Sequence, residues 1–400
     1  MRAAAVRLHR YVGLAMAGYL VIAGLTGSVI AYRHEIDRWL NQDILVGQQA
    51  RQRLALPRLL ESATAYAPGA KPVMIAFGPY PDDAIAVHLR PEVGGGLNRA
   101  YTALYVDPAS GHVLGARDAE RGGLDRRRIM RFLYVLHYSL HGGGIMRIFL
   151  GLVAVVWTLD CFVGFYLTLP RGQPFWRKWT PAWRLKRNAG RYRLSLDLHR
   201  AGGLWLWLLL FAVASSGAYL NLRSIVFDPL IDAVSPLPRS PLATRDAVAS
   251  ETGPDVGFAA AFAIAEQHAT RADWPGTPQF IWHGAEQRLY HIRFDHGGAW
   301  SGPSDVYVDA ESGVLLQERA FAASGATETF RQVQLPLHSG RVAGPIGRFL
   351  ICVTGLIVAM LSITGLIIWW KKRGPRVARR RAITAAKRFP LAIGEPHAAE

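Results

Sequence analysis

The sequence predicts a membrane protein: a four-transmembrane-helix bundle built from two parallel repeats, with two α+β domains outside the membrane. Three observations predict this fold. Half of the 400 residues are hydrophobic, and they gather in four stretches of bilayer length instead of spreading along the chain. Residue patterns recur at fixed offsets between the two halves of the chain. Two long segments between the apolar stretches have the mixed composition of soluble domains.

The four apolar stretches predict transmembrane helices. They contain no Lys, Arg, Asp or Glu, except for Asp160 in the second stretch. A helix of about 22 residues is about 33 Å long, enough to cross a hydrocarbon core of about 30 Å. The first stretch has no small-residue cleavage site at its end, so we expect an uncleaved anchor and not a signal peptide. The expected spans are residues 11–32, 148–170, 201–222 and 349–370.

The charge distribution predicts the orientation of these helices. Residues 1–10, 171–200 and 371–400 hold 21 of the 46 Lys and Arg residues but only 3 of the 29 Asp and Glu residues. Because basic residues concentrate on the cytoplasmic side of membranes, these three segments are expected there. The basic residues also flank membrane helices and lie among tryptophans, which favours lipid contact and argues against nucleic-acid binding. The expected cytoplasmic segments are the N-terminus (1–10), a basic loop (171–200) and a basic tail (371–400). Two outer α+β domains are expected over residues 33–136 and 223–337. The spans are residues 11–32, 137–170, 201–222 and 338–370, where the second and the fourth include a lead-in that carries a histidine.

The membrane helices of the two halves correspond to one another at fixed offsets. Each half runs helix, outer domain, helix, so the two copies share one orientation about an axis along the membrane normal. The symmetry therefore predicts one pair of facing histidines near the inner face of the membrane and another near the outer face. Shifts of 190 and 201 positions superpose His9 on His199, Arg10 on Arg200, Gly27 on Gly217, His137 on His338, Arg147 on Arg348 and Gly164 on Gly365.

The outer segments show the patterns of small α+β domains. The stretches "YVDPASG" (105–111) and "YVDAESG" (307–313) are related by an offset of 202. Alternating apolar residues around Asp-x-x-Ser-Gly predict β-hairpins whose glycine supplies a positive φ. A helix is expected before each hairpin, around residues 55–66 and 257–269.

The matched histidines predict the chemistry. Imidazoles facing one another from two helices can supply both axial ligands of a non-covalently bound b-type haem. We therefore expect two haem b groups, one at each pair, while the absence of a C-x-x-C-H motif excludes covalent c-type haem. Haem propionates favour fixed cations near the interface. The expected axial ligands are His9 with His199 and His137 with His338, and the expected cations are Arg10 and Arg200 at the inner haem and Arg147 and Arg348 at the outer haem.

Other interpretations of the histidines stay open. His137 and His141, four residues apart, present two imidazoles on one helix face, as in a zinc site. His141 stands where the second copy has Val342, so either His137 or His141 is a candidate ligand of the outer iron. A single haem, or purely structural histidines, is also compatible with the pattern.

Three further residues in the spans are notable. Asp160 is a candidate functional group because ionisable residues are rare at such depth. Its expected role is either proton handling or a hydrogen bond to a neighbouring Ser or Thr. Cys161 and Cys352 are expected near opposite ends of their helices, so a disulfide between them is not expected.

Four motifs together carry a family resemblance: "LHR" (8–10), "LHYSLHGGGIMRIFLG" (136–151), "LHSGRVAGPIGRFL" (337–350) and the Asp-x-x-Ser-Gly hairpins. Over nearly its whole length the chain resembles the PepSY-associated transmembrane family of bacterial inner-membrane proteins. The resemblance implies PepSY-like periplasmic domains. Members include di-haem ferric-siderophore reductases of the ferrioxamine-reductase type, which carry two b-type haems and deliver electrons to the periplasm.

The resemblance implies a haem-dependent oxidoreductase. Electrons from an unidentified cytoplasmic donor would cross the membrane and reduce a ferric siderophore in the periplasm, releasing iron because oxygen ligands hold Fe(III) better than Fe(II). One alternative is a membrane module whose PepSY-type domains bind a peptide or protein without redox activity. Another is a haem oxidoreductase acting on quinone or another acceptor. Candidate docking residues on the outer domains are Asp82, Asp83, Trp274, Trp282 and Trp300.

Overall fold

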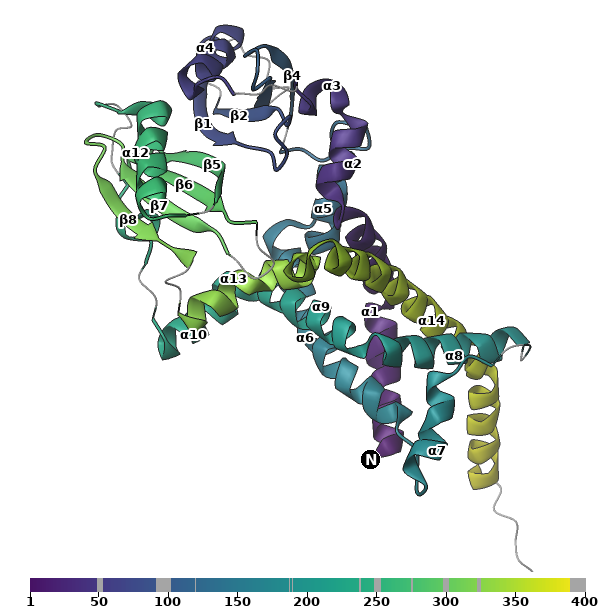
Figure 1. The fold of residues 1–400 in the computed structure, drawn as a ribbon. Coiled ribbons are helices and arrows are strands. Elements are labelled where there is room, and N and C mark those ends of the chain that lie inside the picture. Colours follow the sequence, from purple (N-terminus) through teal and green to yellow (C-terminus); the bar gives the residue numbers. More distant parts are fainter. Residues whose placement is uncertain are drawn as a thin grey trace, which may run out of the picture. The chain divides into compact units, whose positions relative to one another are not determined.

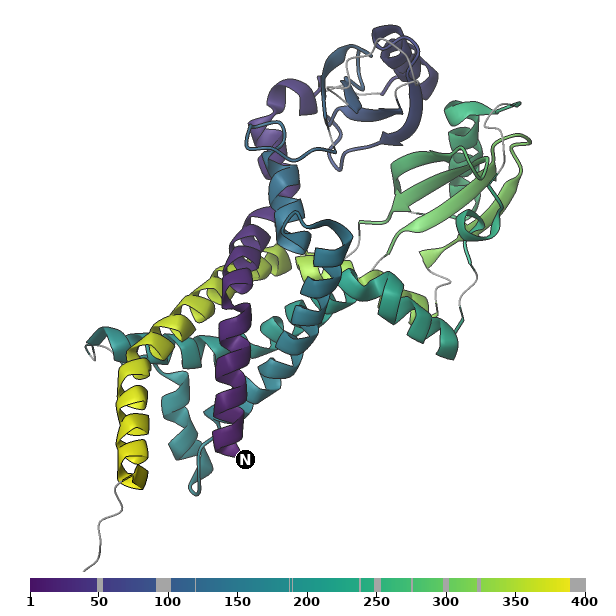
Figure 2. The same cartoon turned by 180° about the vertical axis from the view of Figure 1, so that it is seen from behind.

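The fold consists of membrane helices and a layer of sheet and helices (Figures 1 and 2). The computed structural model describes residues 1–48, 53–90, 102–118, 120–186, 188, 190–236, 239–247, 253–274, 276–297, 302–321 and 325–388, with side chains up to residue 374 in the last range. The chain forms two compact units, which we describe separately. The first unit comprises Met1–Leu25, Val155–Phe211 and Thr354–Glu400, and the second comprises Thr26–Ala154 and Ala212–Val353.

Among the described residues, four helical runs are long and apolar enough to cross a membrane: Arg2–Ile30, Gly143–Thr168, Trp207–Val234 and Arg341–Gly374. Each overlaps one of the spans expected from the sequence. The helices continue beyond the charge-free stretches because Arg and Lys are good helix formers, so a loss of charge marks the bilayer and not the helix end. The elements concerned are α1 (Arg2–Ile30), α6 (Gly143–Thr168), α9 (Trp207–Leu222) with a π-helical turn (Arg223–Phe227) and α10 (Asp228–Val234), and α14 (Gly344–Arg388).

The basic segment 171–200 is not a loop as expected from the sequence. It folds into α7 (Phe175–Trp179), a 3-10 turn (Thr180–Trp183) and most of α8 (Gly190–Trp205). The predicted third span is also divided, since α8 ends at Trp205 and α9 begins at Trp207. Hydrogen bonds from Leu206 to Gly202 (3.3 Å) and from Leu210 to Leu206 (2.8 Å) carry the chain through this junction. The charge pattern did not reveal that this basic segment is largely helical.

The second unit contains one eight-stranded antiparallel sheet with the strand order β4-β3-β2-β1-β5-β6-β7-β8. Strand β1 pairs with β5 through Ile75 opposite Ile281. The two α+β domains expected from the sequence therefore share a single sheet. The strands are β1 (Lys71–Ala76), β2 (Ile85–Arg90), β3 (Ala103–Val106), β4 (Val113–Arg117), β5 (Thr277–Gly284), β6 (Leu289–Asp295), β7 (Ser304–Asp309) and β8 (Leu315–Arg319).

Two helices cover the sheet, α4 (Leu56–Tyr66) before β1 and α12 (Gly257–Arg271) before β5, close to the ranges expected from the sequence. A single apolar core joins buried residues of both helices and of both sets of strands, including Ala63, Ile75, Ala265 and Ile281. The small alanines let the helices approach the sheet closely. The unit also contains α2 (Arg33–Leu40), α3 (Gln42–Leu45), α5 (Ile129–Ser139), α11 (Pro241–Thr244), α13 (Ala326–Ser339) and a 3-10 turn (Arg341–Ala343).

The two Asp-x-x-Ser-Gly hairpins form as expected from the sequence. Asp309 accepts hydrogen bonds from the backbone N–H and the hydroxyl of Ser312, both at 2.8 Å. In the β3–β4 turn, Asp107 accepts from the backbone N–H of Ala109 and the hydroxyl of Ser110. Gly111 and Gly313 have φ of +73° and +71°, which other residues adopt only with strain. The repeated motif therefore encodes one turn geometry.

Candidate functional site

The first histidine pair, His9 and His199, lies in the first unit. His9 projects from α1 and His199 from α8, and their ring centroids are 6.0 Å apart with an interplanar angle of 65°. Each ring lies over a glycine of another helix. A Cβ added at Gly164 of α6 would lie 3.5 Å from Cε1 of His9, and one at Gly365 of α14 would lie 3.2 Å from Cε1 of His199. The two glycines leave room for these rings.

The second histidine pair, His137 and His338, lies in the second unit and repeats this arrangement. His137 is in the last turn of α5 and His338 in the last turn of α13. Their ring centroids are 6.1 Å apart with an interplanar angle of 62°. A Cβ added at Gly27 of α1 would lie 3.0 Å from Cε1 of His137, and one at Gly217 of α9 would lie 3.2 Å from Cε1 of His338. Both pairs thus combine facing imidazoles with a glycine behind each ring.

The spacing within each pair suits one shared metal ion. Two metal–nitrogen bonds of about 2 Å in line place facing imidazole centroids about 6 Å apart. The observed separations of 6.0 and 6.1 Å agree with this distance. Within the described part of the chain, no group of three or more His, Cys, Asp or Glu residues is arranged to hold a metal ion. The geometry therefore fits a metal that takes two protein ligands, as a haem iron does.

Hydrogen bonds orient the rings of the first pair. Nδ1 of His199 donates to the carbonyl oxygen of Leu361 at 2.8 Å and lies 3.2 Å from the Thr364 hydroxyl. Nδ1 of His9 lies 2.9 Å from Oδ2 of Asp160. A proton on Nδ1 leaves the lone pair of a neutral imidazole on Nε2, which is the nitrogen that can bind a metal.

The second pair is oriented by hydroxyl groups. Nδ1 of His338 lies 3.0 Å from the hydroxyl oxygen of Ser216. Because that hydroxyl donates to the Ala212 carbonyl, its oxygen is left to accept the Nδ1 proton. Nδ1 of His137 lies 3.1 Å from the Thr26 hydroxyl oxygen. Thr26 and Ser216 are themselves related by the offset of 190, so one orienting contact occurs in both copies.

His141 does not face another histidine. It is exposed, has a φ of +59°, and stacks on Phe132 with a centroid separation of 4.5 Å. The left-handed backbone at Leu140 and His141 turns the chain away from α5 before α6 begins. Of the two candidates on this segment, the structure brings His137 opposite His338.

Two of the four predicted propionate-binding arginines have partners within the chain. Arg348 forms two hydrogen bonds to the carboxylate of Glu35, at 2.6 and 2.7 Å. Arg200 donates to the buried carboxylate of Asp197 at 3.0 Å. A propionate at either arginine would share it with a carboxylate of the protein, which the sequence pattern did not indicate.

The other two predicted arginines are less committed. The guanidinium of Arg10 lies 5.9 Å from the ring centroid of Tyr11. Nε of Arg147 is buried with no hydrogen-bond partner in the described residues, and so is Nε of Arg200, whose Nη2 donates to Asp197. A buried unpaired donor is costly, and an anionic ligand would satisfy it. These two atoms therefore fit a cofactor that carries carboxylates.

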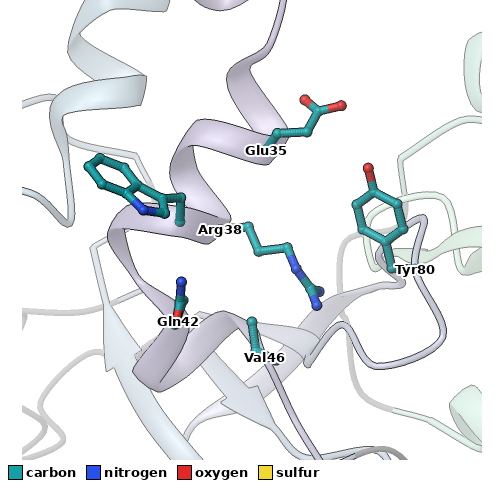
Figure 3. Close-up of a pocket in the computed structure, with 6 residues that line it drawn as sticks. Glu35, Arg38, Gln42, Val46 and Tyr80 are labelled. Atoms are coloured by element: carbon teal, nitrogen blue, oxygen red, sulfur yellow. The ribbon is translucent and has the colours of Figure 1, made fainter. Parts of the chain in front are cut away.

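A cavity of about 440 Å³ lies beside α2, and none of the four paired histidines is among its lining residues. Figure 3 shows the Arg38 side chain directed from α2 toward the loop that carries Tyr80. Arg38 lies 5.2 Å from the Tyr80 ring centroid and donates to Asp82 at 2.6 Å and to Asp83. Burial alone would raise the pKa of Asp83, but hydrogen bonds from His34, the Tyr80 backbone and Arg38 hold it below its usual value. The residues lining the cavity are Glu35, Arg38, Trp39, Gln42, Val46 and Tyr80.

Most of the predicted docking residues have structural roles. Asp82 and Asp83 bind Arg38, so their carboxylates are already paired. Trp274 packs against the shared core, and Trp282 lies on β5 in register with Met74 of β1. Trp300 lies outside the described residues.

Comparison with known proteins assigns the family. The model of the PepSY-associated TM region matches residues 6–372. The chain belongs to this family. A search of curated proteins finds no match. The matched region of this PepSY-associated protein contains both histidine pairs and the sheet and overlaps all four candidate spans. The four apolar helices support a multi-pass membrane protein.

Sequence reasoning found the four facing histidines of this PepSY-associated protein but missed the groups that orient them. Thr26 and Ser216 could have been found, because hydroxyl residues occupy equivalent positions at the offset that relates the histidines. The partner of Asp160 could not, since the second copy has Leu361 there and uses its backbone carbonyl instead. The hydrogen bond to His9 replaces the expected Ser or Thr partner of Asp160.

Proposed function

We propose that this protein is a haem-dependent membrane oxidoreductase that passes electrons across the bilayer to a ferric siderophore in the periplasm. The observation that carries the proposal is the repetition of one geometry in two places, with centroid separations of 6.0 and 6.1 Å and interplanar angles of 65° and 62°. A purely structural role would not require the same centroid separation and the same interplanar angle in both pairs. Two imidazoles that hold one iron would have the same separation at each site.

In this proposal the chain consists of two parallel repeats, and each histidine pair takes one residue from each repeat. The basic segments 1–10, 171–200 and 371–400 place the first pair on the cytoplasmic side by the positive-inside rule. The second pair and the shared sheet then belong to the periplasmic side of a bacterial inner membrane. Electrons would travel from the first pair to the second.

The residues assigned to the two haem b groups are the four histidines. When bound, each haem supplies a one-electron couple. Nε2 of His9 and His199 would hold one iron and Nε2 of His137 and His338 the other, while the Nδ1 hydrogen bonds fix the ring orientations. With two histidines of the protein holding each iron, the arrangement would favour electron transfer over O₂ binding. Arg147 and Arg200, which have buried unpaired Nε atoms, are the best candidates to contact propionates.

The proposed substrate is Fe(III) chelated by the oxygen atoms of a siderophore. A cytoplasmic donor is oxidised, one electron crosses the protein, and the chelated Fe(III) is reduced to Fe(II). Oxygen ligands hold Fe(II) more weakly, so the iron leaves the chelate. No acid–base group of the protein is required for this step, and the family resemblance supplies the substrate class.

The first test is the cofactor content of the purified full-length chain. We expect bis-histidine b-type bands in a dithionite-reduced minus oxidised spectrum, at two haems per chain. His199→Ala and His338→Ala should each remove about half of the haem. His112→Ala, at an exposed position in a hairpin turn, is the matched control and should keep both haems. A colourless preparation would refute the proposal.

The second test identifies the acceptor. Dithionite-reduced protein, freed of excess reductant, is mixed with a ferric trihydroxamate or with a water-soluble quinone. Reoxidation of the haem bands by the ferric chelate, with one Fe(II) trapped by a chelator per electron lost, supports siderophore reduction. Reoxidation by the quinone alone would contradict the siderophore as substrate and leave the haem assignment intact.

A further inference from the structure

The two histidine pairs share one geometry but differ in the oxygen atoms that their Nδ1 atoms contact. Nδ1 of His199 donates to the Leu361 carbonyl, and in the second pair Nδ1 of each ring contacts a hydroxyl oxygen, that of Thr26 or Ser216. Nδ1 of His9 instead lies 2.9 Å from a carboxyl oxygen, Oδ2 of Asp160.

Asp160 is placed where an acidic side chain is unfavourable. Its side chain is 7% exposed, and Oδ1 is buried without a hydrogen-bond partner among the described residues. It belongs to α6, one of the candidate membrane spans. An acidic residue at such a depth is costly and is usually retained for function. Leu361 stands at the matched position in the second half of the chain, so helix packing at this position does not require an acidic residue.

A carboxylate acceptor changes the ligand that it holds. It attracts the Nδ1 proton more strongly than a hydroxyl or amide oxygen does, which makes Nε2 more basic. A more basic axial ligand stabilises Fe(III) relative to Fe(II), and hydrogen bonds around axial ligands are one means by which proteins set haem potentials. The haem of the first pair would therefore be harder to reduce than the haem of the second pair.

We propose that Asp160 is a positioning residue that lowers the reduction potential at the first histidine pair, so that electrons run downhill from the first pair to the second. The inference rests on the proposed function. With haem bound, His9 and His199 would hold the iron that gives up one electron, and His137 and His338 would hold the iron that accepts it. The transfer balances without movement of a proton.

The order of the two potentials can be tested without altering Asp160. Potentiometric titration of the haem-loaded full-length chain, followed by absorbance, should resolve a lower and a higher one-electron couple. His199→Ala should remove the lower couple, and His338→Ala should remove the higher one. If His199→Ala removes the higher couple, the inference is wrong while the haem proposal stands. A preparation without haem would instead refute the proposed function itself.

The role of Asp160 is tested in the His338→Ala background, where only the first site remains. Asp160→Asn and Asp160→Leu should each raise the equilibrium constant for reduction at least tenfold, equivalent to about 59 mV for one electron. Asp160→Leu introduces the residue that stands at the matched position 361. Asp160→Glu should restore most of the lower potential. As a matched control, Asp160→Leu in a His199→Ala background should leave the remaining couple unchanged. An unshifted couple in both the Asn and Leu variants would overturn the assignment.

Discussion

The glycine behind each imidazole allows a sharp test of the paired-histidine site. A methyl group added at Gly27 would place Cβ 3.0 Å from Cε1 of His137. Carbon atoms in contact normally lie about 3.5–4.0 Å apart, so the ring or the helix must give by a few tenths of an ångström. Metal–ligand distances tolerate only about 0.2 Å. Gly27→Ala should therefore weaken haem binding at the second pair by about tenfold or more, with the first pair unaffected.

The assay is the haem-to-protein ratio, followed by titration of the haem-depleted chain with haem. The matched control is Gly18→Ala on the same helix, where an added Cβ meets no atom within 4 Å. Alanine is the better helix former, so neither variant should weaken α1 itself. Wild-type affinity for two haems in Gly27→Ala would refute the close packing of the His137 ring that the site requires.

Two further predictions concern the shared sheet. Ile75→Ala removes a fully buried side chain that faces Ile281 across the β1–β5 pair. The substitution should lower the free energy of unfolding of the sheet by about 2–5 kcal/mol, measured as loss of its circular dichroism at a lower temperature. A change below about 0.5 kcal/mol would argue against that pairing. Asp305 has a pKa lowered to about 2, because hydrogen bonds from His291 and Arg293 outweigh the burial that would raise it. The ionised Asp305 therefore stabilises the fold above about pH 4, and this stabilisation is lost as the pH falls toward 2. In Asp305→Asn the melting temperature should change less between pH 4 and 2 than in the wild type. An equal pH dependence of the two melting temperatures would contradict this.

The sequence predicted the fold to the level that local pattern allows. Charge-free stretches revealed the four spans because the bilayer excludes charge, but they could not mark helix ends, since α1 starts at Arg2 within the basic N-terminus. The hairpins could be predicted from the alternation of apolar and polar residues and from the turn residues between the strands. The helices that cover the sheet were expected just before these hairpins. The pairing of β1 with β5 was missed because each domain alone gives no local sign of which edge strand will be joined.

The site was predicted in the same uneven way. The four facing histidines were detectable because the two copies preserve them at fixed offsets, and a histidine without a counterpart, His141, does not join a pair. Contacts that break the symmetry were not detectable. The hydrogen bond between His9 and Asp160 has its counterpart between His199 and Leu361, but there a backbone carbonyl replaces the side chain, so no repeated residue type marks it.

The junction of β1 and β5 has a consequence for how such a chain can be taken apart. A fragment holding only β1 to β4 would leave the backbone donors and acceptors of β1 open along its length, and open edges recruit other strands. Two such fragments could close each other's edge and rebuild the eight strands as a symmetric dimer. In such a dimer the two fragments would have identical sequences. In a single polypeptide the two halves can differ in sequence, as Asp160 and Leu361 do at matched positions.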